Sequence, residues 1–134
     1  MSHTCTYCGV SHADTLDHVI PRSVGGKLNE GFKKTNTVPA CRECNLLLSN
    51  RLFLTVGSRA AFLAGAIEGR YRKVLRLPKW SEDELEDLSG PMRRTIKAQV
   101  ALAEETRARV LSCEKVSLEA PTVAEVREGT LKGA

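Results

Sequence analysis

Two pairs of cysteines constrain this sequence more than any other feature: Cys5 with Cys8, and Cys41 with Cys44. Each pair has the C-x-x-C spacing, in which a tight turn directs both sulfur atoms toward one tetrahedral metal ion. Residues 9–40 separate the pairs and are poor in apolar side chains, so this part of the chain needs a cross-link to hold together. The two pairs therefore predict a structural Zn²⁺ held by four thiolates.

Other uses of the cysteines fit the sequence less well. A disulfide framework would leave the fifth cysteine, Cys113, unpaired, and a redox C-x-x-C needs only one pair in a βαβ context that this sequence lacks. His3 and His12 flank the first pair and are alternative ligands, but we expect both on the surface. We expect Cys113 to be a small core or surface residue.

The chain of 134 residues is 42% apolar and 27% charged, which fits one small globular domain. Its longest apolar run, residues 60–67, is far shorter than the roughly 20 residues that span a bilayer. The first residues also lack the basic and apolar regions of a signal peptide. We therefore expect a cytoplasmic protein without a membrane partner.

The basic charge lies in the front part of the chain. Residues 1–80 hold twelve Lys and Arg against five Asp and Glu, whereas residues 81–134 hold eight against eleven. A basic front part attracts polyanions such as nucleic acid, although a solvated basic face has the same composition. Charge alone leaves both interpretations open.

Short strands are expected between the cysteine pairs. Thr15–Ile20 has the pattern of a strand that Pro21 ends, and residues 36–38 form a second strand stopped by Pro39. A helix begins near Asn45. The predicted order is strand, turn, strand, helix.

The rest of the chain is predicted to be helical. Apolar residues at helical spacing over residues 62–74 predict a helix that ends before Pro78, and Ser81-Glu-Asp-Glu84 spells a capping box for a short helix to about Leu88. A further apolar stripe predicts a helix over residues 92–112. The apolar stripes of these helices are expected to pack against the metal-binding part of the chain. Alternatively, the stripe of residues 92–112 mediates self-association.

The motif residues between and after the cysteine pairs resemble one known family. After the first Cys-x-x-Cys comes Asp-His-Val-Ile-Pro-Arg-Ser-x-Gly-Gly from Asp17, and then Asn-Thr-Val-Pro-Ala-Cys-x-x-Cys-Asn from Asn36. This spelling resembles the HNH endonucleases, or ββα-metal nucleases, in the subgroup with zinc on two cysteine knuckles. The resemblance covers residues 5 to about 50.

The resemblance implies a role for each polar motif residue. His18 would be the general base that deprotonates water, and Asp17 with Asn45 would hold one catalytic Mg²⁺ or Mn²⁺. Asn36 would bridge the hairpin loop by hydrogen bonds and orient the histidine. Asn45 replaces the last histidine of the family name, an H-N-N variant that favours Mg²⁺ or Mn²⁺. A regular strand would place Asp17 opposite to His18, so both reach one ion only through a bulge or twist.

Basic residues around this motif are candidate phosphate contacts. Arg22 directly follows the catalytic strand, Arg42 lies in the second knuckle, and Arg51 stands near the position where the family often has a lysine. Each would add salt-dependent affinity that does not depend on sequence.

The predicted fold is a small α+β protein: a zinc-stabilised ββα-metal (HNH) core at residues 1–50, a packed helical extension at 51–112 and a flexible tail at 113–134. The predicted function is a metal-dependent DNA endonuclease that leaves 3′-hydroxyl and 5′-phosphate ends and cuts one strand or two, in a bacterial or phage-infected cell. A homodimer or a larger phage or bacterial nucleic-acid machine is the expected assembly. The alternatives are a non-catalytic zinc-ribbon DNA-binding or assembly module and, less favoured, a nuclease for RNA.

Overall fold

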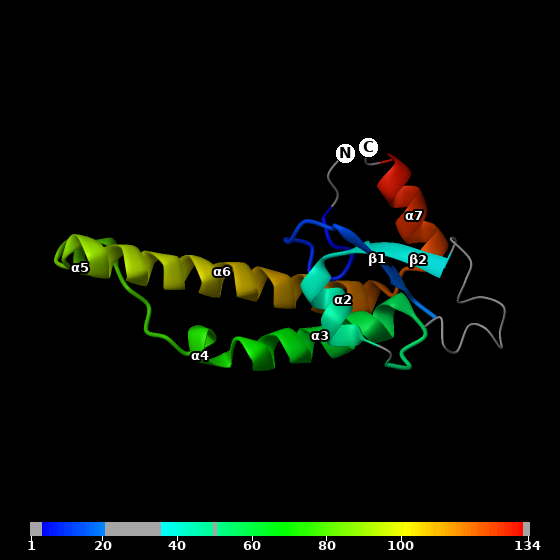
Figure 1. Cartoon of the computed structure of the whole chain (residues 1–134), viewed down its shortest axis with the longest axis horizontal. Coiled ribbons are helices and arrows are strands. Elements are labelled where there is room, and N and C mark those ends of the chain that lie inside the picture. Colours follow the sequence, from blue (N-terminus) through cyan, green and yellow to red (C-terminus); the bar gives the residue numbers. More distant parts are fainter. Residues whose placement is uncertain (1–3, 21–35, 50, 133–134) are drawn as a thin grey trace.

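A small antiparallel sheet lies at one end of an elongated set of helices in the computed structural model, which describes residues 4–20, 36–49 and 51–132 (Figure 1). Strand β1 (Thr15–His18) pairs with β2 (Thr37–Ala40), and helix α2 (Arg42–Leu48) follows β2 directly. The predicted order of strand, strand and helix is present.

Pro39 lies inside β2, opposite Leu16, so the prediction that it stops the second strand is wrong. Its carbonyl accepts a hydrogen bond from the backbone N–H of Thr6 at 2.9 Å, on the side away from β1. In an antiparallel strand the N–H and C=O of one residue face the same side, so the β1–β2 ladder needs no donor from this residue.

The remaining helices are α3 (Val56–Arg70), α4 (Arg72–Leu75), α5 (Glu82–Glu86), α6 (Gly90–Glu119) and α7 (Val123–Lys132). Helices α3 and α6 lie side by side and form the long body of the molecule (Figure 1). The predicted capping box is present at α5, where Ser81 Oγ accepts from the backbone N–H of Glu84 and the Glu84 carboxylate accepts from that of Ser81. The predicted α+β class is confirmed.

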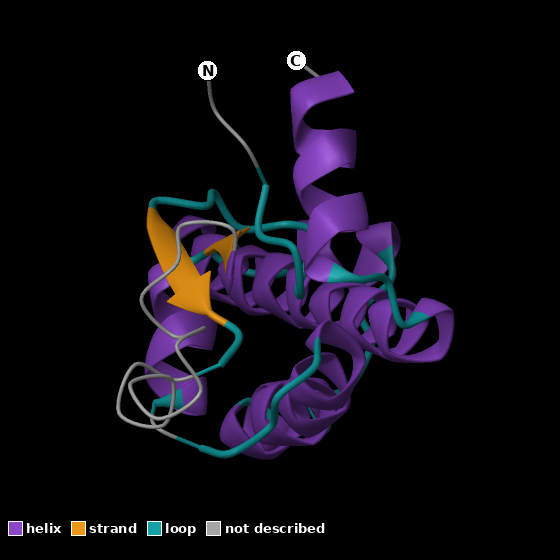
Figure 2. Ribbon diagram, turned by 90° about the vertical axis from the view of Figure 1, so that its right-hand side faces the viewer, coloured by secondary structure: helices purple, strands orange, loops and turns teal. Residues whose placement is uncertain are grey.

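One continuous apolar core joins the knuckles to the helices. It contains the cysteines of both pairs, β2 and the buried faces of α3 and α6, with Val38, Ala60, Leu63, Ile67, Val110 and Cys113 among its members. Figure 2 shows the sheet against the ends of the two long helices. The helices therefore supply the apolar surface that the knuckle region lacks.

The flexible tail predicted from residue 113 is replaced by helix in the structure. Helix α6 continues to Glu119 with Cys113 fully buried, and α7 packs Val123 and Val126 against the core. The α7 side chain of Arg127 donates to the Thr37 carbonyl of β2 at 3.2 Å. None of the described helices is both long and apolar enough to cross a membrane.

The first knuckle packs closely on α6 at Gly9. This glycine has φ +66°, and a Cβ added there would lie 2.5 Å from Ser112 Oγ. The Ser112 hydroxyl donates to the Tyr7 carbonyl at 2.9 Å, so it is not free to move aside.

We expect Gly9→Ala to lower the free energy of unfolding by about 2 kcal/mol, because it combines left-handed strain with a steric clash. Urea unfolding of the zinc-loaded protein measures the change. Gly69→Ala on α3 is the matched control, since an added Cβ there would meet no described atom within 4 Å apart from its chain neighbours and the nearby backbone of its own helix; it should be neutral or stabilising. An unchanged urea midpoint for Gly9→Ala would contradict the packing described.

Candidate functional site

The four knuckle cysteines meet in one buried cluster. Their sulfur atoms all lie within 4.8 Å of one another, with Cys8 Sγ and Cys41 Sγ 3.9 Å apart. Four sulfur ligands about 2.3 Å from a tetrahedral Zn²⁺ would lie about 3.8 Å apart. Each of the four residues is no more than 4% exposed. The donor set and its spacing fit the structural zinc predicted from the sequence.

The four thiols perturb one another's protonation. Hydrogen bonding to Cys41 lowers the pKa of the Cys8 thiol, and hydrogen bonding to Cys44 lowers the pKa of Cys41 to about 6. The pKa of Cys44 is raised, first by its interaction with Cys41. Thiolates this close repel one another, and a bound divalent cation stabilises all four in the ionised form.

Arg109 of α6 brings positive charge to this cluster. Its Nη2 donates to Cys44 Sγ at 3.9 Å, and its Nη1 lies 2.6 Å from Glu43 Oε1. Burial lowers the pKa of Arg109, but interactions with Cys8 and Glu43 outweigh burial and raise it, so the guanidinium stays charged. Four thiolates around Zn²⁺ leave a net charge of about −2, which this guanidinium offsets.

Glu43, inside the second knuckle, ties α2 to both long helices. Besides Arg109, its carboxylate accepts a hydrogen bond from the Tyr71 hydroxyl at 2.5 Å and lies 3.2 Å from Arg70 Nε. Burial raises the pKa of Glu43, but these three partners outweigh it and lower the pKa. The second knuckle is therefore anchored by an ionised carboxylate.

We expect Arg109→Gln to release zinc to a chelator roughly tenfold faster than the wild type, because the charge of the thiolate cluster is no longer offset. A colorimetric zinc-release assay measures the rate. Arg107→Gln is the control, since Arg107 lies on the same helix but is exposed and away from the cysteines. Equal release rates for the two variants would show that the guanidinium does not stabilise the cluster.

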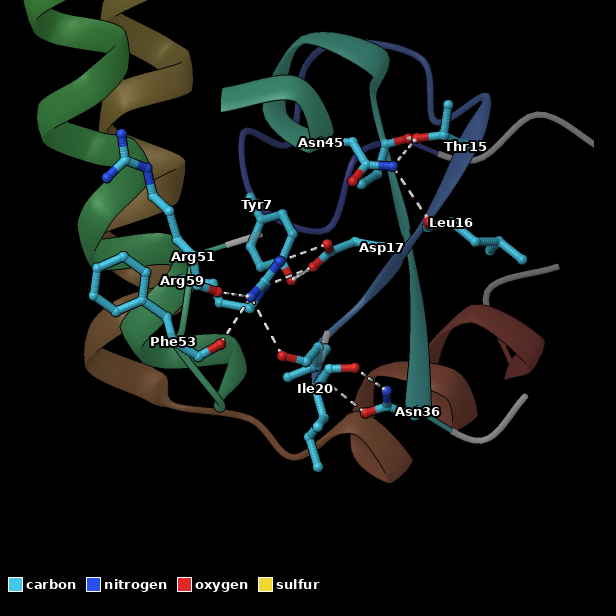
Figure 3. A network of polar contacts seen from close by, with 12 residues as sticks. Tyr7, Thr15, Leu16, Asp17, Ile20, Asn36, Asn45, Arg51, Phe53 and Arg59 are labelled. Atoms are coloured by element: carbon cyan, nitrogen blue, oxygen red, sulfur yellow. Dashed lines mark hydrogen bonds and ion pairs between the residues drawn. The ribbon is translucent and has the colours of Figure 1, made fainter. Parts of the chain in front are cut away.

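Asp17 occupies a different environment from the one predicted for a metal ligand. It is 2% exposed, and its carboxylate accepts hydrogen bonds from Arg59 Nε and Nη2 at 2.8 and 2.7 Å and from the Tyr7 hydroxyl at 2.5 Å (Figure 3). Strand β1 pairs regularly with β2, without the bulge that would bring Asp17 and His18 to one ion. With both oxygens paired, this carboxylate does not fit the predicted shared Mg²⁺ site.

His18 ends β1 on the more exposed face, opposite Asp17. Within the described part of the chain its imidazole makes no hydrogen bond, and it is partly exposed. Asn36 holds the residues that follow: its Nδ2 donates to the Ile20 carbonyl at 2.9 Å, and its Oδ1 accepts from the Ile20 N–H at 3.1 Å. The Asn36 carbonyl also accepts from the Val19 N–H at 3.0 Å. These contacts support the bridging role that the resemblance implies for Asn36.

Asn45 and Arg42 lie together at a shallow hollow beside β1. Asn45 Nδ2 donates to Thr15 Oγ1 at 3.2 Å and to the Leu16 carbonyl at 3.3 Å (Figure 3). The hollow has a volume of about 420 Å³ and is also lined by Leu46 and Ser49. Arg42 is exposed at its rim. The structure thus brings one predicted phosphate contact next to one predicted metal ligand.

Of the other two predicted phosphate contacts, Arg51 is described and does not line this hollow. The Arg51 guanidinium lies over the Phe62 ring, 4.5 Å from its centroid. Figure 3 shows Arg51 beside α3 and away from Asn45. Arg22 lies outside the described residues. His12, the alternative zinc ligand, is exposed and outside the cysteine cluster, and His3 also lies outside the described residues.

The sequence patterns did not identify two residues of the site, Tyr7 and Arg59. Tyr7 stands between the cysteines of the first knuckle, and this position is its only local signal. Arg59 carries none, because helical periodicity assigns it to the outer face of its helix, whereas it is 1% exposed. Its partner Asp17 lies 42 positions earlier in the chain.

The fold and the cysteine cluster define a small zinc-binding domain of ββα order with helices packed against it. Residues 5–51 match the model of the HNH endonuclease family, which confirms the resemblance for this segment. The match indicates nuclease activity in general terms. Comparisons with curated proteins and with solved structures gave no match.

Proposed function

We propose that this protein is a metal-dependent DNA endonuclease in which His18 deprotonates the attacking water. The observation that carries the proposal is the position of His18 within the matched segment. Its side chain is partly exposed, while its neighbours Asp17 and Val19 are both held by the buried Arg59 guanidinium. An imidazole held in this way presents a ring nitrogen that can take a proton from water.

Asn45 lies beside the strand that carries His18. Its amide donates to the Leu16 carbonyl, and His18 stands two residues further on, about 7 Å along the strand. No described residue donates to Asn45 Oδ1, so this oxygen is available to a hard cation. Mg²⁺ or Mn²⁺ bound there would stabilise negative charge on the scissile phosphate and the leaving oxygen.

Arg42 supports binding of the substrate backbone. Its exposed guanidinium at the rim of the hollow can pair with a phosphate beside the one being cut. The basic charge of residues 1–80 attracts the polyanion to the same part of the chain.

We expect His18→Ala to lower the rate of plasmid cleavage at least about 100-fold, because the general base is lost. Supercoiled plasmid is incubated with zinc-loaded protein and Mg²⁺, Mn²⁺ or EDTA, and the nicked and linear forms are separated on a gel. His12→Ala is the control, since His12 is exposed and outside the cysteine cluster. A zinc-loaded wild type that binds DNA in a salt-sensitive way without cutting it would favour the binding-module alternative. Cleavage of RNA alone would overturn the choice of DNA.

We expect Arg42→Gln to weaken DNA binding and to reduce the slope of log K against log salt by about one unit, because one phosphate contact is lost. Fluorescence anisotropy on a short duplex at several salt concentrations measures both quantities. Lys97→Gln, at an exposed position on α6 that does not line the hollow, has the same net charge as the test variant and should retain the wild-type slope. Identical slopes for the two variants would remove Arg42 from the binding surface.

A further inference from the structure

Arg59 is a buried charged residue in contact with both sequence neighbours of His18. Its Nε and Nη2 form a two-point pair with the Asp17 carboxylate, and its Nη1 donates to the Val19 carbonyl at 3.3 Å. The same Nη1 donates to the Phe53 carbonyl at 2.8 Å in the segment that leads into α3. One guanidinium therefore links the strand before and after His18 to the helical half of the protein.

We propose that Arg59 is a positioning residue for His18, and that Asp17 is its anchor on the strand rather than a ligand of the catalytic metal. This inference rests on the proposed nuclease function. Asp17 and Val19 are both 2% exposed and point inward, so the intervening His18 projects outward from a strand whose rotation is fixed. The Asn36 side chain holds the backbone of Ile20, two residues after His18, by two hydrogen bonds.

The charge state of the pair supports its role as an anchor. Burial lowers the pKa of Arg59, but the hydrogen bond and charge of Asp17 outweigh burial and raise it, so the guanidinium is ionised. The buried Tyr7 hydroxyl donates a hydrogen bond to the same carboxylate. A cation at Asp17 would have to displace a guanidinium that would then be buried without a partner.

The test compares four variants: Arg59→Gln, Asp17→Asn, the double variant that carries both changes, and Arg59→Lys. Zinc content and urea unfolding are measured without Mg²⁺, and plasmid cleavage is measured over a range of Mg²⁺ concentrations. Arg94→Lys, at an exposed position on α6, is the control and should match the wild type.

We expect each single neutral variant to unfold at lower urea, because it leaves one buried charge unpaired, and the double variant to recover at least about half of that shift. Arg59→Lys retains the charge but loses the two-point geometry. Its kcat should fall about tenfold, while KM and the Mg²⁺ concentration for half-maximal activity stay within about twofold of the wild type.

Two results would overturn the inference while leaving the nuclease function in place. One is wild-type kcat in Arg59→Lys. The other is a double variant that regains stability but needs about tenfold more Mg²⁺ than the wild type, which would identify Asp17 as a metal ligand. A zinc-loaded wild type that cuts no nucleic acid would overturn the proposed function itself, and the positioning role with it.

Discussion

The meeting of four cysteine sulfurs in one cluster is the constraint on which the rest of this structure depends. Each knuckle carries a polar side chain between its two cysteines, and each of these side chains reaches a helix or strand outside the knuckle. Tyr7 donates to Asp17 on β1, and Glu43 pairs with Arg109 on α6. The cluster therefore sets the position of the sheet and of the long helices together.

The sequence predicted the parts of the site that local patterns encode. The cysteine spacing predicted the cluster, the alternation of a strand placed Asp17 opposite His18, and the serine–glutamate pair predicted the start of α5. The partner of Asp17 could not be predicted in this way. Arg59 lies in another element, and nothing in helical periodicity distinguishes a buried arginine that meets a carboxylate from one that faces water.

The buried face of the long helix α6 could not be predicted from its apolar residues alone. The apolar stripe predicted for it includes Met92 and Leu111, which are 54% and 63% exposed, whereas the polar residues Thr106 and Arg109 are buried. The Thr106 hydroxyl donates a hydrogen bond to the Leu102 carbonyl of its own helix, and Arg109 forms an ion pair with Glu43 of the second knuckle. A face that packs on a metal-binding region is chosen by polar partners as well as by apolar area, so hydropathy alone misplaces it.

The hydrogen bond between the Ser112 hydroxyl and the Tyr7 carbonyl joins residues 105 positions apart. During synthesis, the first knuckle is therefore made long before its partner on α6. A chain that leaves the ribosome from its N-terminus presents both knuckles and β1 before Arg59, and Arg59 before Arg109 and Ser112. Contacts over such separations close late in folding, because the loop entropy is lost before the contact forms. The nascent segment of residues 5–51 therefore contains its motif residues well before the helices that hold them in place are synthesised.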